Sequence, residues 1–157
     1  MQPPAQHTSA PAADTLQAWS VAHIRAIFEA QSADACRAAV HATFAHDAAV
    51  QLNGAALGGA QLERAVLALL EAGGYALRVQ WRDVLGVPRD EAHRDGVVGG
   101  CYVIYNVRKP GQAALFARHK FVNAVIRSGA DEGDGDSRRI VQLSVASVDK
   151  PMAESRL

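Results

Sequence analysis

AAVQLNGAALGGAQLERAVLALL (residues 48–70) changes character three times within a short span. Ala48 to Leu52 has the composition of a strand, and Asn53-Gly54 is the dipeptide favoured by a two-residue hairpin turn. After a brief return strand, Gly58-Gly59 allows a sharp change of direction, and apolar residues then recur at helical spacing from Leu62. The stretch predicts a small hairpin that leads directly into a helix. We expect these two elements to connect the helices and the sheet of a fold that encloses a pocket.

Two helices are predicted before this stretch and four long strands after it. Asp14 is the expected N-cap of the first helix and Ser32 that of the second, which should end near His46. The strands are expected from Tyr75 onward, over 97–107, over 114–127 and over 139–148. Helices gathered before an antiparallel meander predict an α+β fold, in which a curved antiparallel sheet wraps around the N-terminal helices as a cone-shaped half-barrel.

Length and composition indicate one domain and exclude several classes of partner. The chain has 157 residues, of which 49% are hydrophobic, so we expect a single domain over residues 14–150, a disordered tail over 1–13 and a short C-terminal tail over 151–157. Sixteen basic residues balance sixteen acidic ones, which argues against nucleic acid as a partner. No apolar run approaches the roughly 20 residues of a membrane span, and the start lacks the features of a signal peptide, so we expect a cytoplasmic protein.

The order of elements and the passage AHDAAVQLNG…GG…L resemble the nuclear transport factor 2-like superfamily, which includes ketosteroid isomerase, scytalone dehydratase and polyketide-cyclase-like proteins. The resemblance covers about Leu16 to Val148. It implies a cystatin-like cone whose strands curve around an apolar cavity with one open end. It also implies a homodimer formed through the outer face of the sheet. The sequence itself has no Gly-rich phosphate loop at a strand-to-helix junction, so no cofactor is expected.

The isomerase members guide the choice of site residues. The resemblance places Leu52, or Asn53 if the register slips by one residue, where the isomerases have their general-base carboxylate. It places Arg118 where they have a protonated carboxylic acid, so steroid isomerisation is disfavoured. The same alignment turns Arg118 and Lys120 towards the cavity. Arg118 would then hold an anionic or carbonyl-bearing ligand, or else form a structural ion pair with a neighbouring strand.

Asp83 and His23 are the candidates for proton transfer. Asp83 shares the strand parity of Trp81, so both are expected inside the cone. There Asp83 would pair with Arg118 or act as a base; the alternative is an exposed carboxylate at a strand end. His23 lies one helical turn from Trp19 on an apolar stripe. It is either a general acid or base, as in scytalone-dehydratase-like members, or a core histidine bonded to a backbone carbonyl.

Tyrosine and histidine spacing complete the candidate set. Tyr102 and Tyr105 differ in parity, so only one faces the cavity, and the turn at Pro110-Gly111 leaves open which; we favour Tyr105. His41 and His46 are five residues apart, a spacing that does not place two ligands on one helix face, and no third ligand stands nearby. No metal site is therefore expected.

Two functions are compatible with these residues. The first is a pocket that binds a small, mainly apolar molecule with a carbonyl or weakly acidic group. Any catalysis would be isomerisation, dehydration or cyclisation, with Arg118 polarising an oxygen and Asp83 or His23 moving the proton. The second is a non-catalytic dimerisation or protein-docking domain, favoured by outward apolar residues such as Phe121 and Val125. A deep cavity with converging polar groups would favour the first, and a filled cone with an apolar outer patch the second.

Overall fold

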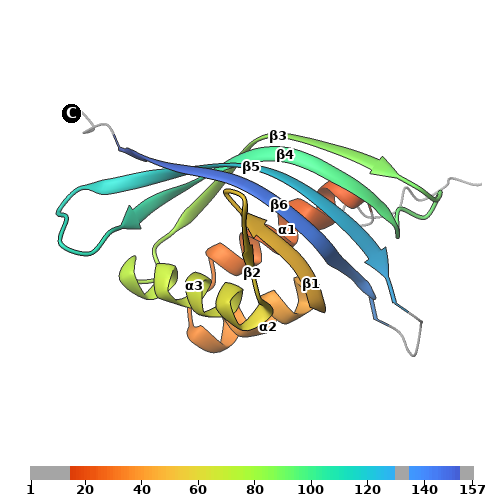
Figure 1. The fold of residues 1–157 in the computed structure, drawn as a ribbon, viewed down its shortest axis with the longest axis horizontal. Helices are drawn as coiled ribbons and strands as arrows, with labels where there is room; N and C mark the ends of the chain where they lie inside the picture. Colours follow the sequence, from red (N-terminus) through yellow and green to blue (C-terminus); the bar gives the residue numbers. More distant parts are fainter. Residues whose placement is uncertain (1–14, 130–134, 153–157) are drawn as a thin grey trace, which may run out of the picture.

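The computed structural model describes residues 15–129 and 135–152, so the expected N-terminal tail and most of the expected C-terminal tail lie outside the described residues. Three helices cover one face of a single curved sheet (Figure 1). In chain order the elements are α1 (Leu16–Phe28), α2 (Ala33–Thr43), β1 (Phe44–Leu52), β2 (Ala55–Leu57), α3 (Gly59–Ala72), β3 (Arg78–Pro88), β4 (Gly96–Arg108), β5 (Leu115–Ser128) and β6 (Arg138–Pro151). None of these helices is long and apolar enough to cross a membrane.

The helix ends follow local hydrogen bonding. The Thr15 hydroxyl accepts a hydrogen bond from the Ala18 amide at 3.1 Å, so Thr15 and not Asp14 is the N-cap of α1. Ser32 caps α2 in the same way, as predicted. Phe44 is already extended, with φ −105° and ψ 138°, so α2 ends at Thr43, before the expected position near His46.

The hairpin between β1 and β2 has the predicted turn. Asn53 and Gly54 have φ values of 50° and 84°, the left-handed pair that a type I′ turn requires. The Asn53 side chain also donates to the Ser147 carbonyl at 3.1 Å and accepts from the Ser147 amide at 2.7 Å. These two bonds fix the turn against β6.

The sheet is mixed, whereas a wholly antiparallel sheet was predicted. Its strand order is β2-β1-β6-β5-β4-β3, and β3 to β6 form the predicted antiparallel meander. At the other side, β1 pairs in parallel with β6. All of α3 and β3 to β5 lies between these two strands in the chain, so no local turn fixes their relative direction.

Two irregularities break the alternation of side chains along the strands. The pairing of β3 with β4 shifts between Trp81 and Asp83, and that of β4 with β5 shifts between Ile104 and Val107. Asn106, within the second shift, has a φ of 69°. Because side chains alternate with a period of two, each such bulge moves the residues beyond it to the opposite face.

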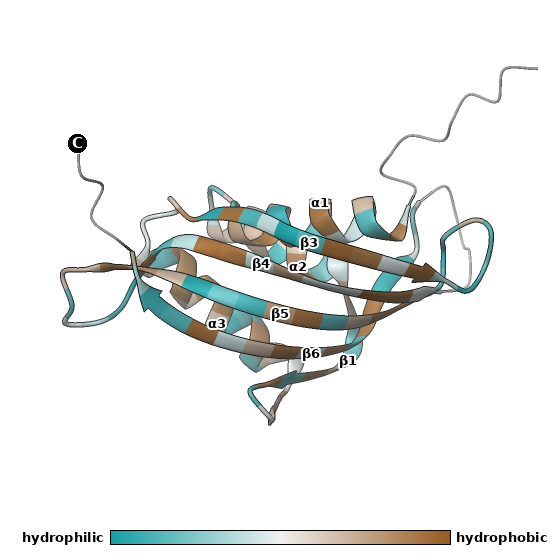
Figure 2. Cartoon of the chain, turned by 90° about the horizontal axis from the view of Figure 1, so that it is seen from above, coloured by the Kyte–Doolittle hydropathy of each residue, from teal (hydrophilic) through white to brown (hydrophobic). Residues whose placement is uncertain are grey.

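The core lies between the inner face of the sheet and the helices. One cluster joins all three helices to the centre of β4, and a second joins the start of α1 to β1, β5 and β6. Figure 2 looks onto the other, outer face of the sheet, with the helices behind it. This layering leaves one side of the strands β3 to β6 uncovered by the rest of the described chain.

Candidate functional site

A small cavity lies between the inner face of the sheet and the helices α1 and α3. Its volume is about 80 Å³, well below the roughly 300–1,000 Å³ of ordinary ligand pockets. At 10–15 Å³ per water position, it has room for about five to eight water-sized groups. Three of its lining side chains are polar, and they belong to Tyr102, Arg118 and Lys120. The other walls are apolar and come from Ile24, Ile27, Phe28, Phe44, Val50, Leu52, Leu57, Leu62, Ala65, Val66, Leu69, Leu143 and Val145.

Lys120 brings a cation into this apolar space. It lies on β5 directly opposite Tyr102 of β4, and both face inward. Its Nζ is 4.7 Å from the centre of the Phe28 ring and 6.0 Å from that of Tyr102. Among the described residues, Nζ has no hydrogen-bond acceptor and no carboxylate within ion-pair distance.

The surroundings weaken the protonated form of this lysine. Burial lowers the pKa of Lys120 to about 8; the charge of Arg118 lowers it further, and Asp149 opposes the change. The Lys120 side chain is half-buried and lines the cavity. Cation–π attraction to two rings offsets only part of the solvation that the ammonium loses.

Arg118 faces the cavity, as predicted, but its guanidinium is bound by a neighbouring strand. Nε lies 2.7 Å from Asp149 Oδ1, and a terminal nitrogen lies 3.0 Å from Oδ2. Lys109 Nζ is 3.1 Å from the same carboxylate. Hydrogen bonds from Arg118 hold the pKa of Asp149 below its usual value. The carboxylate beside Arg118 is therefore Asp149 and not Asp83, and Lys120 is the cation left without a partner in the described cavity.

The expected orientation of Tyr105 is wrong, and Tyr102 is the tyrosine inside the cone. Tyr102 is 3% exposed, packs on Trp81 with a centroid distance of 4.6 Å, and has no hydrogen-bond partner within the described chain. Burial raises its pKa, so its hydroxyl remains a neutral donor. The Tyr105 hydroxyl instead lies on the outer face, 2.8 Å from an Arg82 nitrogen and 3.2 Å from Gln80 Oε1.

The bulge at Asn106 explains this error. Val107 is fully buried on the inner face, and unbroken alternation would place Tyr105 beside it. The irregular pairing between Ile104 and Val107 reverses the parity, so Ile104 is buried and Tyr105 turns outward.

The predicted inward position of Asp83 is also wrong. Trp81 points inward and packs behind Tyr102, but the bulge that follows it turns Asp83 to the outer face. There Asp83 is exposed and lines a shallow groove with Leu85 and Phe121. A carboxylate on that face cannot reach Lys120 or Arg118 through the sheet. Trp81 supports the cavity wall without lining it.

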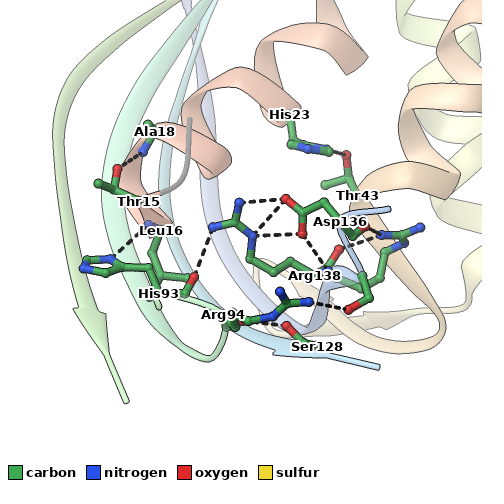
Figure 3. A network of polar contacts seen from close by, with 12 residues as sticks. Thr15, Leu16, Ala18, His23, Thr43, His93, Arg94, Ser128, Asp136 and Arg138 are labelled. Atoms are coloured by element: carbon green, nitrogen blue, oxygen red, sulfur yellow. Dashed lines mark hydrogen bonds and ion pairs between the residues drawn. The ribbon is translucent and has the colours of Figure 1, made fainter. Parts of the chain in front are cut away.

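His23 and Trp19 form a separate cluster, and Figure 3 shows His23 beside Thr43. Their rings stack at 4.2 Å, and neither lines the cavity that holds Lys120. His23 Nδ1 is 3.0 Å from the Thr43 hydroxyl, which itself donates to the Ala39 carbonyl at 2.7 Å. That hydroxyl therefore accepts from His23, and we assign the ring proton to Nδ1. Burial lowers the pKa of His23, with Asp136 opposing the change and Arg139 adding to it.

Arg138, which was not among the predicted site residues, lies in the same region and connects several elements at this end of the cone. Its side chain is buried, donates to both carboxylate oxygens of Asp136, and donates to the His93 carbonyl at 3.0 Å (Figure 3). The guanidinium also lies 5.7 Å from the centre of the Trp19 ring. These contacts join β6, the β3–β4 loop and α1, so the role of Arg138 is structural. Its shared parity with the apolar Ile140 was the available sequence signal.

No family model and no curated protein matches this chain. Solved structures with a similar architecture include a putative calcium/calmodulin-dependent protein kinase II association domain from Xanthomonas campestris, with a TM-score of 0.58 and 12% identity over 83% of this chain and 87% of that one. A ketosteroid isomerase-like protein from Erwinia carotovora atroseptica has a TM-score of 0.55 and 14% identity over 88% of this chain and 97% of that one. An NTF-2-like protein of unknown function from Pseudomonas aeruginosa has a TM-score of 0.54 and 16% identity over 83% of this chain and 93% of that one. The chain has the α+β cone fold of the nuclear transport factor 2-like proteins, as the order of its elements predicted.

Proposed function

We propose that this chain binds a small molecule bearing an acidic or carbonyl oxygen, and that Lys120 recognises that oxygen. The observation that carries the proposal is the Lys120 ammonium, which lies in a mainly apolar cavity and has no carboxylate within ion-pair distance among the described residues. An unpaired charge in such a place is costly, and a ligand oxygen would supply the missing interaction. Arg118 is less suited to this task because Asp149 already occupies its guanidinium.

The cavity also limits the ligand. Tyr102 adds a neutral donor opposite Lys120, which suits a carboxylate or a carbonyl with one or two acceptor atoms. The apolar walls suit a short hydrocarbon portion, and a volume of about 80 Å³ favours a molecule with few heavy atoms. Proton transfer by Asp83 and His23 has no geometric support, since neither side chain lines this cavity. Ligand recognition is therefore the better-supported function.

Butyrate is a suitable probe, since it combines a carboxylate with a three-carbon chain. We expect it to bind the wild type at pH 7 in an NMR titration and to lose about 10- to 150-fold in affinity in Lys120→Met, which corresponds to the loss of one charge-assisted hydrogen bond of about 1.5–3 kcal/mol. Lys150→Met, at an exposed position on β6, is the matched control and should bind butyrate as the wild type does. Equal affinity in Lys120→Met and the wild type would refute the proposal.

A separate observation favours self-association through the outer sheet face. Large apolar side chains there remain 55–67% exposed, and they belong to Leu85, Val87, Phe121 and Val148. Beside the projecting Phe121 ring, Gly99 leaves the sheet bare, and a groove of about 460 Å³ opens between that ring and Leu85. A projection and a hollow on one surface suit a two-fold interface, in which each copy fills the groove of the other. We propose that a second copy of this chain covers this face.

A further inference from the structure

We propose that Lys120 forms a covalent imine with a small aldehyde or ketone that enters the cavity. This inference rests on the proposed function, because it names a class of ligand for the same pocket and adds a covalent step. The amine lies among apolar and aromatic side chains, with the Phe28 ring 4.7 Å away. No described carboxylate holds it as an ion pair, so its lone pair is not committed to another group once the proton leaves.

The other two lysines of the chain provide a contrast. Lys109 Nζ lies 3.1 Å from Asp149 Oδ2, and Lys150 is exposed. Neither lies in an apolar cavity. A pKa of about 8 in place of 10.5 raises the neutral fraction of Lys120 at pH 7 from roughly 0.03% to roughly 10%. Desolvation of a lysine in a hydrophobic pocket is one of the recognised ways to activate this side chain as a nucleophile.

The reaction is balanced without an oxidant, reductant or cofactor. The neutral Nζ adds to the carbonyl carbon, the π electrons of the C=O bond move to oxygen, and a proton passes from nitrogen to oxygen to give a carbinolamine. The nitrogen lone pair then forms the C=N bond, the C–O bond breaks, and the hydroxyl leaves as water with the second proton, which comes from the remaining N–H. The Tyr102 hydroxyl, on the neighbouring strand and without a partner in the described residues, is placed to donate a hydrogen bond to the carbonyl oxygen.

Reductive trapping tests the proposal. Propanal and sodium cyanoborohydride are added to the full chain at pH 7, and the modified lysine is located by mass spectrometry of the intact protein and its peptides. Hydride reduction of the imine leaves one propyl group on nitrogen. We expect Lys120 to be modified at least about tenfold faster than Lys150, and the rate at Lys120 to rise with pH and level off above about pH 8. Modification of Lys109 and Lys150 at a rate equal to or above that of Lys120 would overturn the proposal.

Lys120→Arg separates the covalent step from simple recognition. Arginine keeps the cation but forms no such imine, so this variant should lose trapping at position 120 while retaining more butyrate affinity than Lys120→Met. If propanal does not trap Lys120 and butyrate binding still depends on it, the imine is refuted and the proposed pocket stands. If butyrate binding is also independent of Lys120, both are refuted.

Discussion

Replacing Lys120 with methionine should stabilise the fold, although it removes the side chain that we propose to be functional. The pKa of Lys120 falls from 10.5 to about 8 in the folded chain, and each pKa unit corresponds to about 1.4 kcal/mol. Keeping the ammonium in the cavity at pH 7 therefore costs about 3 kcal/mol. Methionine has a similar length and no charge, so Lys120→Met should raise the free energy of unfolding by about 2–3 kcal/mol.

The sign of the pH dependence follows from the direction of this shift. Below about pH 8 the lysine is charged in both the folded and the unfolded chain, so the full cost is present. Between about pH 8 and 10.5 the folded chain has lost the proton and the unfolded chain still holds it, so the wild type gains stability relative to the variant as the pH rises. The advantage of Lys120→Met is therefore largest at neutral pH and smaller at pH 10.

Urea unfolding at pH 7 and at pH 10 measures both effects. Lys150→Met is the control, and because its side chain is exposed it should change the free energy of unfolding by no more than about 0.5 kcal/mol. Two results would refute the reasoning. One is a Lys120→Met variant that is less stable than the wild type at pH 7, and the other is a variant whose gain in stability is the same at pH 7 and at pH 10. Loss of butyrate binding together with a gain in stability would show a residue kept for function at a cost to the fold.

Three other changes test separate parts of the structure. Arg118→Met should lower the free energy of unfolding by about 1–2 kcal/mol at pH 7. The loss should be smaller at pH 3, because the lowered pKa of Asp149 means that the ion pair contributes stability at neutral pH and loses it as Asp149 becomes protonated. A fall in butyrate affinity without any loss of stability would instead assign Arg118 to recognition. Phe121→Glu should convert the expected homodimer into a monomer in sedimentation velocity at micromolar concentration, and a monomeric wild type would contradict the proposed interface. Asn53→Ala should lower the free energy of unfolding in urea by about 2 kcal/mol, since it removes both hydrogen bonds to Ser147 and puts alanine in a left-handed conformation. Asn53→Gly removes the same bonds without the strain and should lower it less. Equal losses in the two variants would mean that backbone strain contributes nothing.

The local signals of the sequence were sufficient for most of the fold. The Asn53-Gly54 turn, the Ser32 cap and the change of period from helix to strand are set by neighbouring residues, and the structure confirms each of them. The parallel pairing of β1 with β6 depends instead on how distant segments pack, and no turn chemistry encodes it.

The site was predictable only where the strands are regular. β5 keeps its alternation from Arg118 to Ala124, so the inward positions that the resemblance implied for Arg118 and Lys120 are found in the structure. Asp83 and Tyr105 lie next to bulges, and one extra residue was enough to place each on the wrong face. The partner of Arg118 is Asp149, which lies directly across the strand pair, and its identity depended on a register that the sequence does not specify.

The most direct test of the central claim is an NMR titration of the lysine side chains. The chain has three lysines, so the signals next to each Nζ can be assigned with Lys120→Met. We expect the Lys120 signal to titrate with a pKa of about 8, and this pKa to rise when butyrate is added, because a bound carboxylate stabilises the ammonium. A Lys120 signal that titrates above about pH 10 and does not respond to butyrate would contradict both the buried cation and its proposed role in recognition.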